Sequence, residues 1–168
     1  MAELSPLWLA TTWGLSCETL LFAVLYPLHK WPRGKKASHV FFNPQDYAAS
    51  ETAKTGGVPF PEETKAATFE PFIAQYTGMA KVTIALAAAS ISFGGVNTTN
   101  PQIWTAKLLL SYSIAFSLLF CVFMINFYEN YLHDLKSYKP WLAALVESCG
   151  VTSLVCFGLG YWYWARHL

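Results

Sequence analysis

The sequence contains few charged residues. Asp, Glu, Lys and Arg together make up 12% of its 168 residues, about half the share found in a typical soluble domain. So few charges cannot cover the surface of a soluble protein of this length, and the mean hydropathy is +0.33. The pI of 7.7 also argues against a nucleic-acid-binding module, which needs a strongly basic surface. These values exclude a disordered chain and a soluble enzyme, and they indicate a protein whose solvent is the bilayer.

The sequence also lacks the motifs of common catalytic and metal sites. It contains no G-x-S-x-G, H-E-x-x-H or Walker motif. Its four cysteines form no C-x-x-C pair, and its four histidines lie in expected loops or near helix ends. Neither a zinc site nor bis-histidine haem ligation is therefore expected. We predict no metal, no cofactor and no catalytic residue, which argues against an enzyme but leaves that question open.

Four long apolar runs are the main feature of the sequence. A membrane helix needs about 20 mainly apolar residues, and a backbone inside lipid must satisfy its own hydrogen bonds, which favours helices over strands. We predict an all-α integral membrane four-helix bundle, a single domain over residues 1–168, with a long ordered loop between the first and second helices. The first run is too long for a signal peptide and is expected to be retained. The predicted spans are residues 6–28, 76–96, 103–128 and 141–164.

Basic residues near the helix ends predict the orientation. Cytosolic loops of membrane proteins are enriched in Lys and Arg, and a basic cluster follows the first span directly. The loop 29–75 is therefore assigned to the cytosolic or matrix side, with both termini on the opposite side. The same side chains are candidates for binding anionic lipid headgroups. The cluster consists of Lys30, Arg33, Lys35 and Lys36.

Four residues with charged side chains (Asp, Glu, Lys or Arg) lie inside the predicted spans. An ionised side chain is costly in hydrocarbon, so such residues usually pair with one another or carry function. Judged by depth, Glu18, Lys81 and Glu147 are expected to share the inner half of the bundle as one charge cluster. We interpret this cluster as a structural ion pair that fixes helix packing, and a proton or cation relay is the functional alternative. The fourth residue, Lys107, is expected to extend towards the membrane interface.

Small residues recur at three- and four-residue steps along the second predicted span. Such side chains let helix backbones approach closely inside a membrane. They predict a helix contact, either within the chain or with another subunit. The residues are Ala85, Ala88, Ala89, Ser92 and Gly95.

One stretch of the long loop resembles a known family. Basic residues 33–36 are followed by Phe41-Phe42-Asn43-Pro44-Gln45-Asp46, which is similar to the start of the cytosolic loop in the MAPEG family of microsomal glutathione transferases and prostaglandin E synthase. The order of four spans, with the longest loop after the first, also resembles that family. The resemblance implies a MAPEG-like fold, a homo-oligomer and a glutathione-dependent membrane enzyme.

The arginines that the family uses are missing at the matching places. Where the family opens its second helix with a Glu-Arg pair, this chain has Glu62-Glu63-Thr64-Lys65, and residues 124–128 contain none of the arginines of the family's third helix. Without a guanidinium, little remains to bind the glutathione carboxylates or to activate the thiol. We therefore expect the fold without the family's chemistry and assign no catalytic residue by resemblance.

The sequence as a whole favours a non-catalytic accessory subunit of a larger membrane protein complex. Its expected partners are the lipid bilayer and other membrane protein subunits, or copies of itself if the chain is MAPEG-like, and no nucleic acid. An internal membrane is expected, either the mitochondrial inner membrane or the endoplasmic reticulum. Two alternatives stay open: a glutathione- or lipid-dependent membrane enzyme of MAPEG type, and a proton- or ion-conducting element built on the charge cluster.

Overall fold

Four long helices make up the described part of the chain. The computed structural model describes residues 6–30, 62–93, 100–132 and 140–167, and these residues contain no strand. The helices are α1 (Pro6–Lys30), α3 (Glu62–Phe93), α4 (Pro101–Leu132) and α5 (Pro140–His167). Each contains an apolar stretch long enough to cross a membrane: Leu7–Leu28, Glu70–Phe93, Pro101–Glu129 and Trp141–His167. The predicted all-α four-helix bundle is thus confirmed, and the chain is a multi-pass integral membrane protein.

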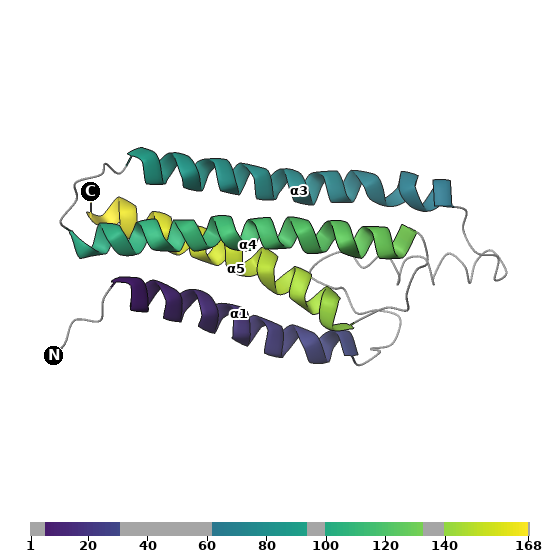
Figure 1. The fold of residues 1–168 in the computed structure, drawn as a ribbon, viewed down its shortest axis with the longest axis horizontal. Coiled ribbons are helices and arrows are strands. Elements are labelled where there is room, and N and C mark those ends of the chain that lie inside the picture. Colours follow the sequence, from purple (N-terminus) through teal and green to yellow (C-terminus); the bar gives the residue numbers. More distant parts are fainter. Residues whose placement is uncertain (1–5, 31–61, 94–99, 133–139, 168) are drawn as a thin grey trace.

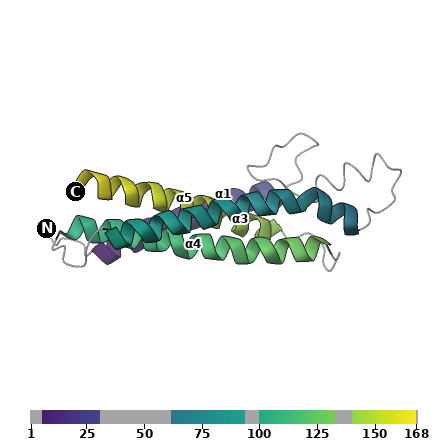
Figure 2. The ribbon, with the colours of Figure 1, turned by 90° about the horizontal axis from the view of Figure 1, so that it is seen from above.

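The helices lie side by side and alternate in direction (Figures 1 and 2). The start of α1 and the end of α5 lie at the same end of the bundle, as an even number of spans requires (Figure 1). The most extensive packing is between α4 and α5; α3 packs mainly on α4, and α1 packs on α5 and α4. As a result, α1 and α3 form opposite edges of the bundle (Figure 1).

The start of α3 differs most from the sequence-based expectation. This helix begins at Glu62, whereas the second span was expected at 76–96, after a loop ending at residue 75. Glu, Lys and Ala favour helices, and acidic residues in the first turn interact well with the helix dipole, so residues after Glu62 extend the helix. Pro71 lies inside it and removes one backbone hydrogen bond without ending the helix. The rest of the predicted loop, residues 31–61, lies outside the described residues.

This earlier start places Lys81 deeper than expected. The predicted span boundaries put Lys81 close to the inner surface of the membrane. In the structure it lies near the middle of the apolar stretch Glu70–Phe93, roughly 17 Å from either end at 1.5 Å per residue. Glu18 lies near the middle of Leu7–Leu28. Each residue therefore lies near the middle of the apolar stretch of its own helix, which gives the two a similar depth.

A glycine brings α4 and α5 close together. A Cβ atom on Gly160 would lie 2.9 Å from Cγ of Leu110 and 3.2 Å from the carbonyl oxygen of Ala106. Leu110 and Ala106 are both fully buried, so the two helices leave no room for a side chain at this point. A Cβ atom on Gly158, one half-turn earlier, would meet no atom within 4 Å. The close contact between α4 and α5 thus depends on Gly160 and not on Gly158.

Candidate functional site

The carboxylate of Glu18 on α1 is held by three side chains of α5. The Ser148 hydroxyl donates a hydrogen bond to Oε1 at 2.6 Å, and the Thr152 hydroxyl donates to Oε2 at 2.7 Å. The Cys149 thiol makes a longer contact with Oε1 at 3.7 Å. The three donors are buried and Glu18 is half-buried. Because residues three and four apart share one face of a helix, this part of α5 presents a set of neutral donors to the carboxylate.

These hydrogen bonds do not neutralise the charge of an ionised Glu18. A carboxylate offers about four acceptor positions, and three are used here, two on Oε1 and one on Oε2. Among residues 6–30, 62–93, 100–132 and 140–167, no cationic side chain forms an ion pair with Glu18. Oε2 therefore keeps one unused acceptor position among the described residues, and the described part of one chain supplies no cation to the site.

A second group of hydroxyls lies between α4 and α5. Ser153 donates a hydrogen bond to the carbonyl oxygen of Ser113 at 3.1 Å, and its hydroxyl also pairs with the hydroxyl of Ser117. All three serines are buried. Because Ser153 follows Thr152 directly, α5 uses neighbouring residues to bind α1 on one side and α4 on the other.

Replacing Ser153 tests the contribution of this group. We expect Ser153→Ala to lower the free energy of unfolding by about 1 kcal/mol. Polar contacts between membrane helices contribute about 0.6 kcal/mol on average, and this change removes two of them, the hydrogen bonds with Ser113 and Ser117. Ser111→Ala is the matched control, since Ser111 is exposed and donates only to the Lys107 carbonyl of its own helix. Unfolding in mixed micelles measures both variants, and equal stability of the two would contradict the assignment.

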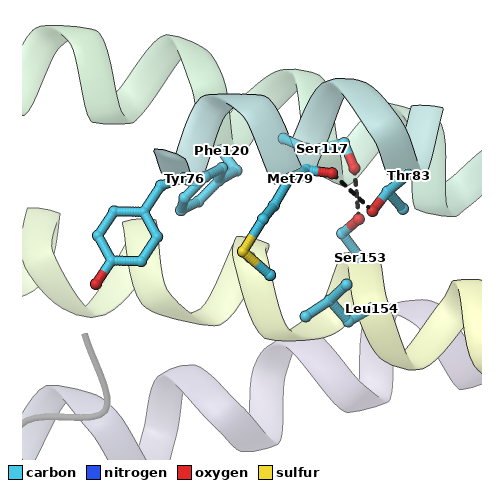
Figure 3. A pocket seen from close by; sticks show the side chains of 9 residues that line it. Tyr76, Met79, Thr83, Ser117, Phe120, Ser153 and Leu154 are labelled. Atoms are coloured by element: carbon cyan, nitrogen blue, oxygen red, sulfur yellow. Dashed lines mark hydrogen bonds between the residues drawn. The ribbon is translucent and has the colours of Figure 1, made fainter. Parts of the chain in front are cut away.

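A small pocket opens beside these serines, between α3, α4 and α5 (Figure 3). Thr83 and Met79 line it from α3, and the hydrogen-bonded Ser117 and Ser153 line it from α4 and α5. Thr83 donates to the carbonyl oxygen of Met79 at 3.0 Å, so its hydroxyl is also satisfied. The volume is about 40 Å³, whereas pockets for small molecules usually measure about 300–1,000 Å³. The described part of one chain therefore does not enclose a site for a tripeptide such as glutathione in this pocket.

Lys81 lies on the exposed face of α3. Lys81 is near the middle of the apolar stretch, roughly 17 Å from either end. Its flexible side chain is too short to reach either membrane surface from there. No carboxylate in the described ranges forms an ion pair with it. In an isolated chain its ammonium group would face lipid, at a cost of about 2.5–3.5 kcal/mol. Lys81 is thus the cation at the same depth as Glu18, on the opposite edge of the bundle.

The three charges predicted to cluster are distributed over the bundle. Glu18 is bound by α5, Lys81 is exposed on α3, and Glu147 is buried on α5. The structure therefore does not bring Lys81 and Glu18 together within one chain, because their helices form opposite edges. Lys107 lies with its Nζ 5.7 Å from the centroid of the Trp104 ring.

Ser148, Cys149 and Thr152 were not predicted from the sequence as partners of Glu18. Their three- and four-residue spacing within an apolar span was the available signal. Of the predicted headgroup-binding residues, Lys30 is the last residue of α1. The other three, Arg33, Lys35 and Lys36, lie outside the described residues.

Comparison of the chain with known proteins gives no match. No protein-family model, no curated protein and no solved structure matches it. The segment 41–46 that resembles the MAPEG family lies outside the described residues. Membership of that family therefore stays a prediction.

Proposed function

We propose that this chain is a non-catalytic subunit of a larger membrane protein assembly, in which a helix of a neighbouring subunit covers the exposed face of α3. The observation that supports this proposal is the position of Lys81, a cation at the centre of the membrane on a face that the described chain leaves open. Charged residues in membrane spans usually face a protein interior and pair with an opposite charge. A neighbouring carboxylate at the same depth would remove the cost of exposing Lys81 to lipid.

The residues around Lys81 suit a close helix contact. Ala85, Ala88 and Ser92 follow it at three- and four-residue steps and are exposed, so they lie on the same face of α3. Small side chains on such a face allow another helix to approach closely. Ser92 donates a hydrogen bond to the carbonyl of Ala88 at 2.9 Å, so this face offers no unsatisfied hydroxyl. These small residues are therefore assigned to a contact between subunits rather than within the chain.

The proposal extends to the setting of the assembly. We place it in an internal membrane, either the mitochondrial inner membrane or the endoplasmic reticulum, and a MAPEG-like fold without the family's chemistry is compatible with it. The enzyme alternative is tested by a thiol-conjugation assay on the purified protein. Turnover of glutathione above background would contradict the non-catalytic assignment.

The mass of the purified protein tests the proposal. In mild detergent we expect a particle clearly larger than one chain of 18.8 kDa, as measured by native mass spectrometry. We expect Lys81→Leu to shift the particle towards single chains by at least about tenfold, because the neighbouring carboxylate then loses its partner in hydrocarbon, where such a charge costs about 2.5–3.5 kcal/mol.

Lys107→Leu is the control for this experiment. It also removes a lysine from a span, but one that lies near the end of the apolar stretch and over Trp104, and we expect it to leave the particle intact. A wild-type protein that runs as a single chain would overturn the proposal.

A further inference from the structure

We propose that the neighbour covering α3 is a second copy of this chain, and that Lys81 of one copy pairs with Glu18 of the next. This inference rests on the proposed function and names the partner at the same face. A neighbouring copy would supply the missing partner at each of two sites that the single chain leaves incomplete. One site is the exposed cation on α3, and the other is the carboxylate on α1 that keeps an unused acceptor position among the described residues.

The two residues match in depth and in charge. Each lies near the middle of its own apolar stretch, Leu7–Leu28 for Glu18 and Glu70–Phe93 for Lys81. Rotating a second copy about the membrane normal keeps every residue at its depth. It can therefore bring the α1 edge of one copy against the α3 edge of the next, with opposite charges at the same level. A contact between two different surfaces of identical chains forms rings when the rotation closes.

The hydrogen bonds at Glu18 leave it able to accept the lysine. Ser148 and Cys149 both contact Oε1, whereas Oε2 accepts only from Thr152 among the described residues. Glu18 is half-buried, so part of its side chain stays accessible from outside the bundle. The α5 donors fix the orientation of the carboxylate, and the lysine of the neighbour supplies the missing charge.

Charge reversal in two differently tagged copies tests the pair. With wild-type copies, capture of one tag is expected to recover the other. Lys81→Glu in both copies is expected to lower this recovery at least tenfold, since two carboxylates then meet in the membrane. Combining a Lys81→Glu copy with a Glu18→Lys copy is expected to restore recovery, because the interface between them again joins opposite charges. Restoration would not occur if the two residues met different partners.

A cross-linking experiment covers the case in which Glu18→Lys fails to fold. One copy carries Leu15→Cys and the other carries Ala85→Cys. Both positions are exposed, and they lie three and four residues from Glu18 and Lys81, on the same side of their helices. We expect a bis-maleimide to join these copies, above the background of chains with only the four native cysteines. Ser111→Cys, exposed on α4, replaces Ala85→Cys in the control and is expected to give no product.

The outcomes separate this inference from the proposed function. Particles that contain one copy of this chain with a different polypeptide, and no cross-link between copies, would overturn the inference and leave the proposed function standing. A wild-type protein found only as single chains would overturn both. Cross-linking between copies together with restored capture would support both.

Discussion

Gly160→Val is expected to lower the free energy of unfolding by about 1–3 kcal/mol, the usual cost of forcing extra carbon atoms into a packed interior. A Cβ atom at this position would approach Cγ of Leu110 at 2.9 Å and the backbone oxygen of Ala106 at 3.2 Å. The leucine can rotate, but the backbone oxygen can move only if α4 and α5 separate. Unfolding by sodium dodecyl sulfate in mixed micelles, followed by circular dichroism, measures the loss.

Gly158→Val is the matched control for this prediction. It places the same side chain on the same helix, where a Cβ atom would meet nothing within 4 Å. We expect it to change the stability by less than about 0.5 kcal/mol, as surface substitutions usually do. If both variants lost the same stability, the effect would come from valine in the helix rather than from the contact between α4 and α5.

Glu18→Leu is expected to destabilise the packing of α1 on α5 by about 2 kcal/mol. Two hydroxyl donors lose a charged acceptor, and hydrogen bonds to charged groups contribute about 1.5–3 kcal/mol in soluble proteins but less within membranes. Ser148 retains the Leu145 carbonyl at 3.1 Å as an acceptor. Thr152 retains only a weak contact with the Cys17 sulfur at 3.9 Å. Most of the loss should therefore come from Thr152, and a Glu18→Leu, Thr152→Val double variant should lose less than the sum of the two single changes.

Thr19→Leu serves as the control at the next position. Thr19 is exposed and donates only to the Leu15 carbonyl of its own helix, so little change in stability is expected. A Glu18→Leu variant as stable as the wild type would show that the cost of placing a carboxylate in the membrane offsets its hydrogen bonds, as happens for some buried ion pairs. The same purified variants are suitable for testing proton or ion flux, the alternative function that the sequence leaves open.

The number and type of the helices could be predicted from the sequence because each apolar run is long enough to cross a bilayer. The start of α3 was missed because the predicted spans followed the apolar runs, and residues 62–75 precede the second run. Glu62 and Glu63, directly after Pro61, were the available signal for a helix start, since acidic residues favour the first turn of a helix.

The partner of Glu18 and the exposure of Lys81 could not be predicted in the same way. A span that is apolar on every side gives no pattern that tells which face turns inwards. Only the few polar and small residues indicate which face of a span turns inwards. On one helix alone, they do not distinguish a face that packs within the chain from a face that is exposed. Ala88 faces outwards whereas Ala87 is fully buried, although both belong to the same run of three alanines. The rotation of each helix about its axis is set by its neighbours.

The hydrogen bonds between α1 and α5 join parts of the chain that are synthesised at different times. Glu18 and the two hydroxyls that donate to it are separated by 130 and 134 residues, so at about 5–20 residues per second the ribosome needs roughly 7–27 s to supply the second half of the contact. Throughout that interval α1 carries a carboxylate whose donors do not yet exist. The contact of α1 with α5 is therefore completed only after α5 has been synthesised.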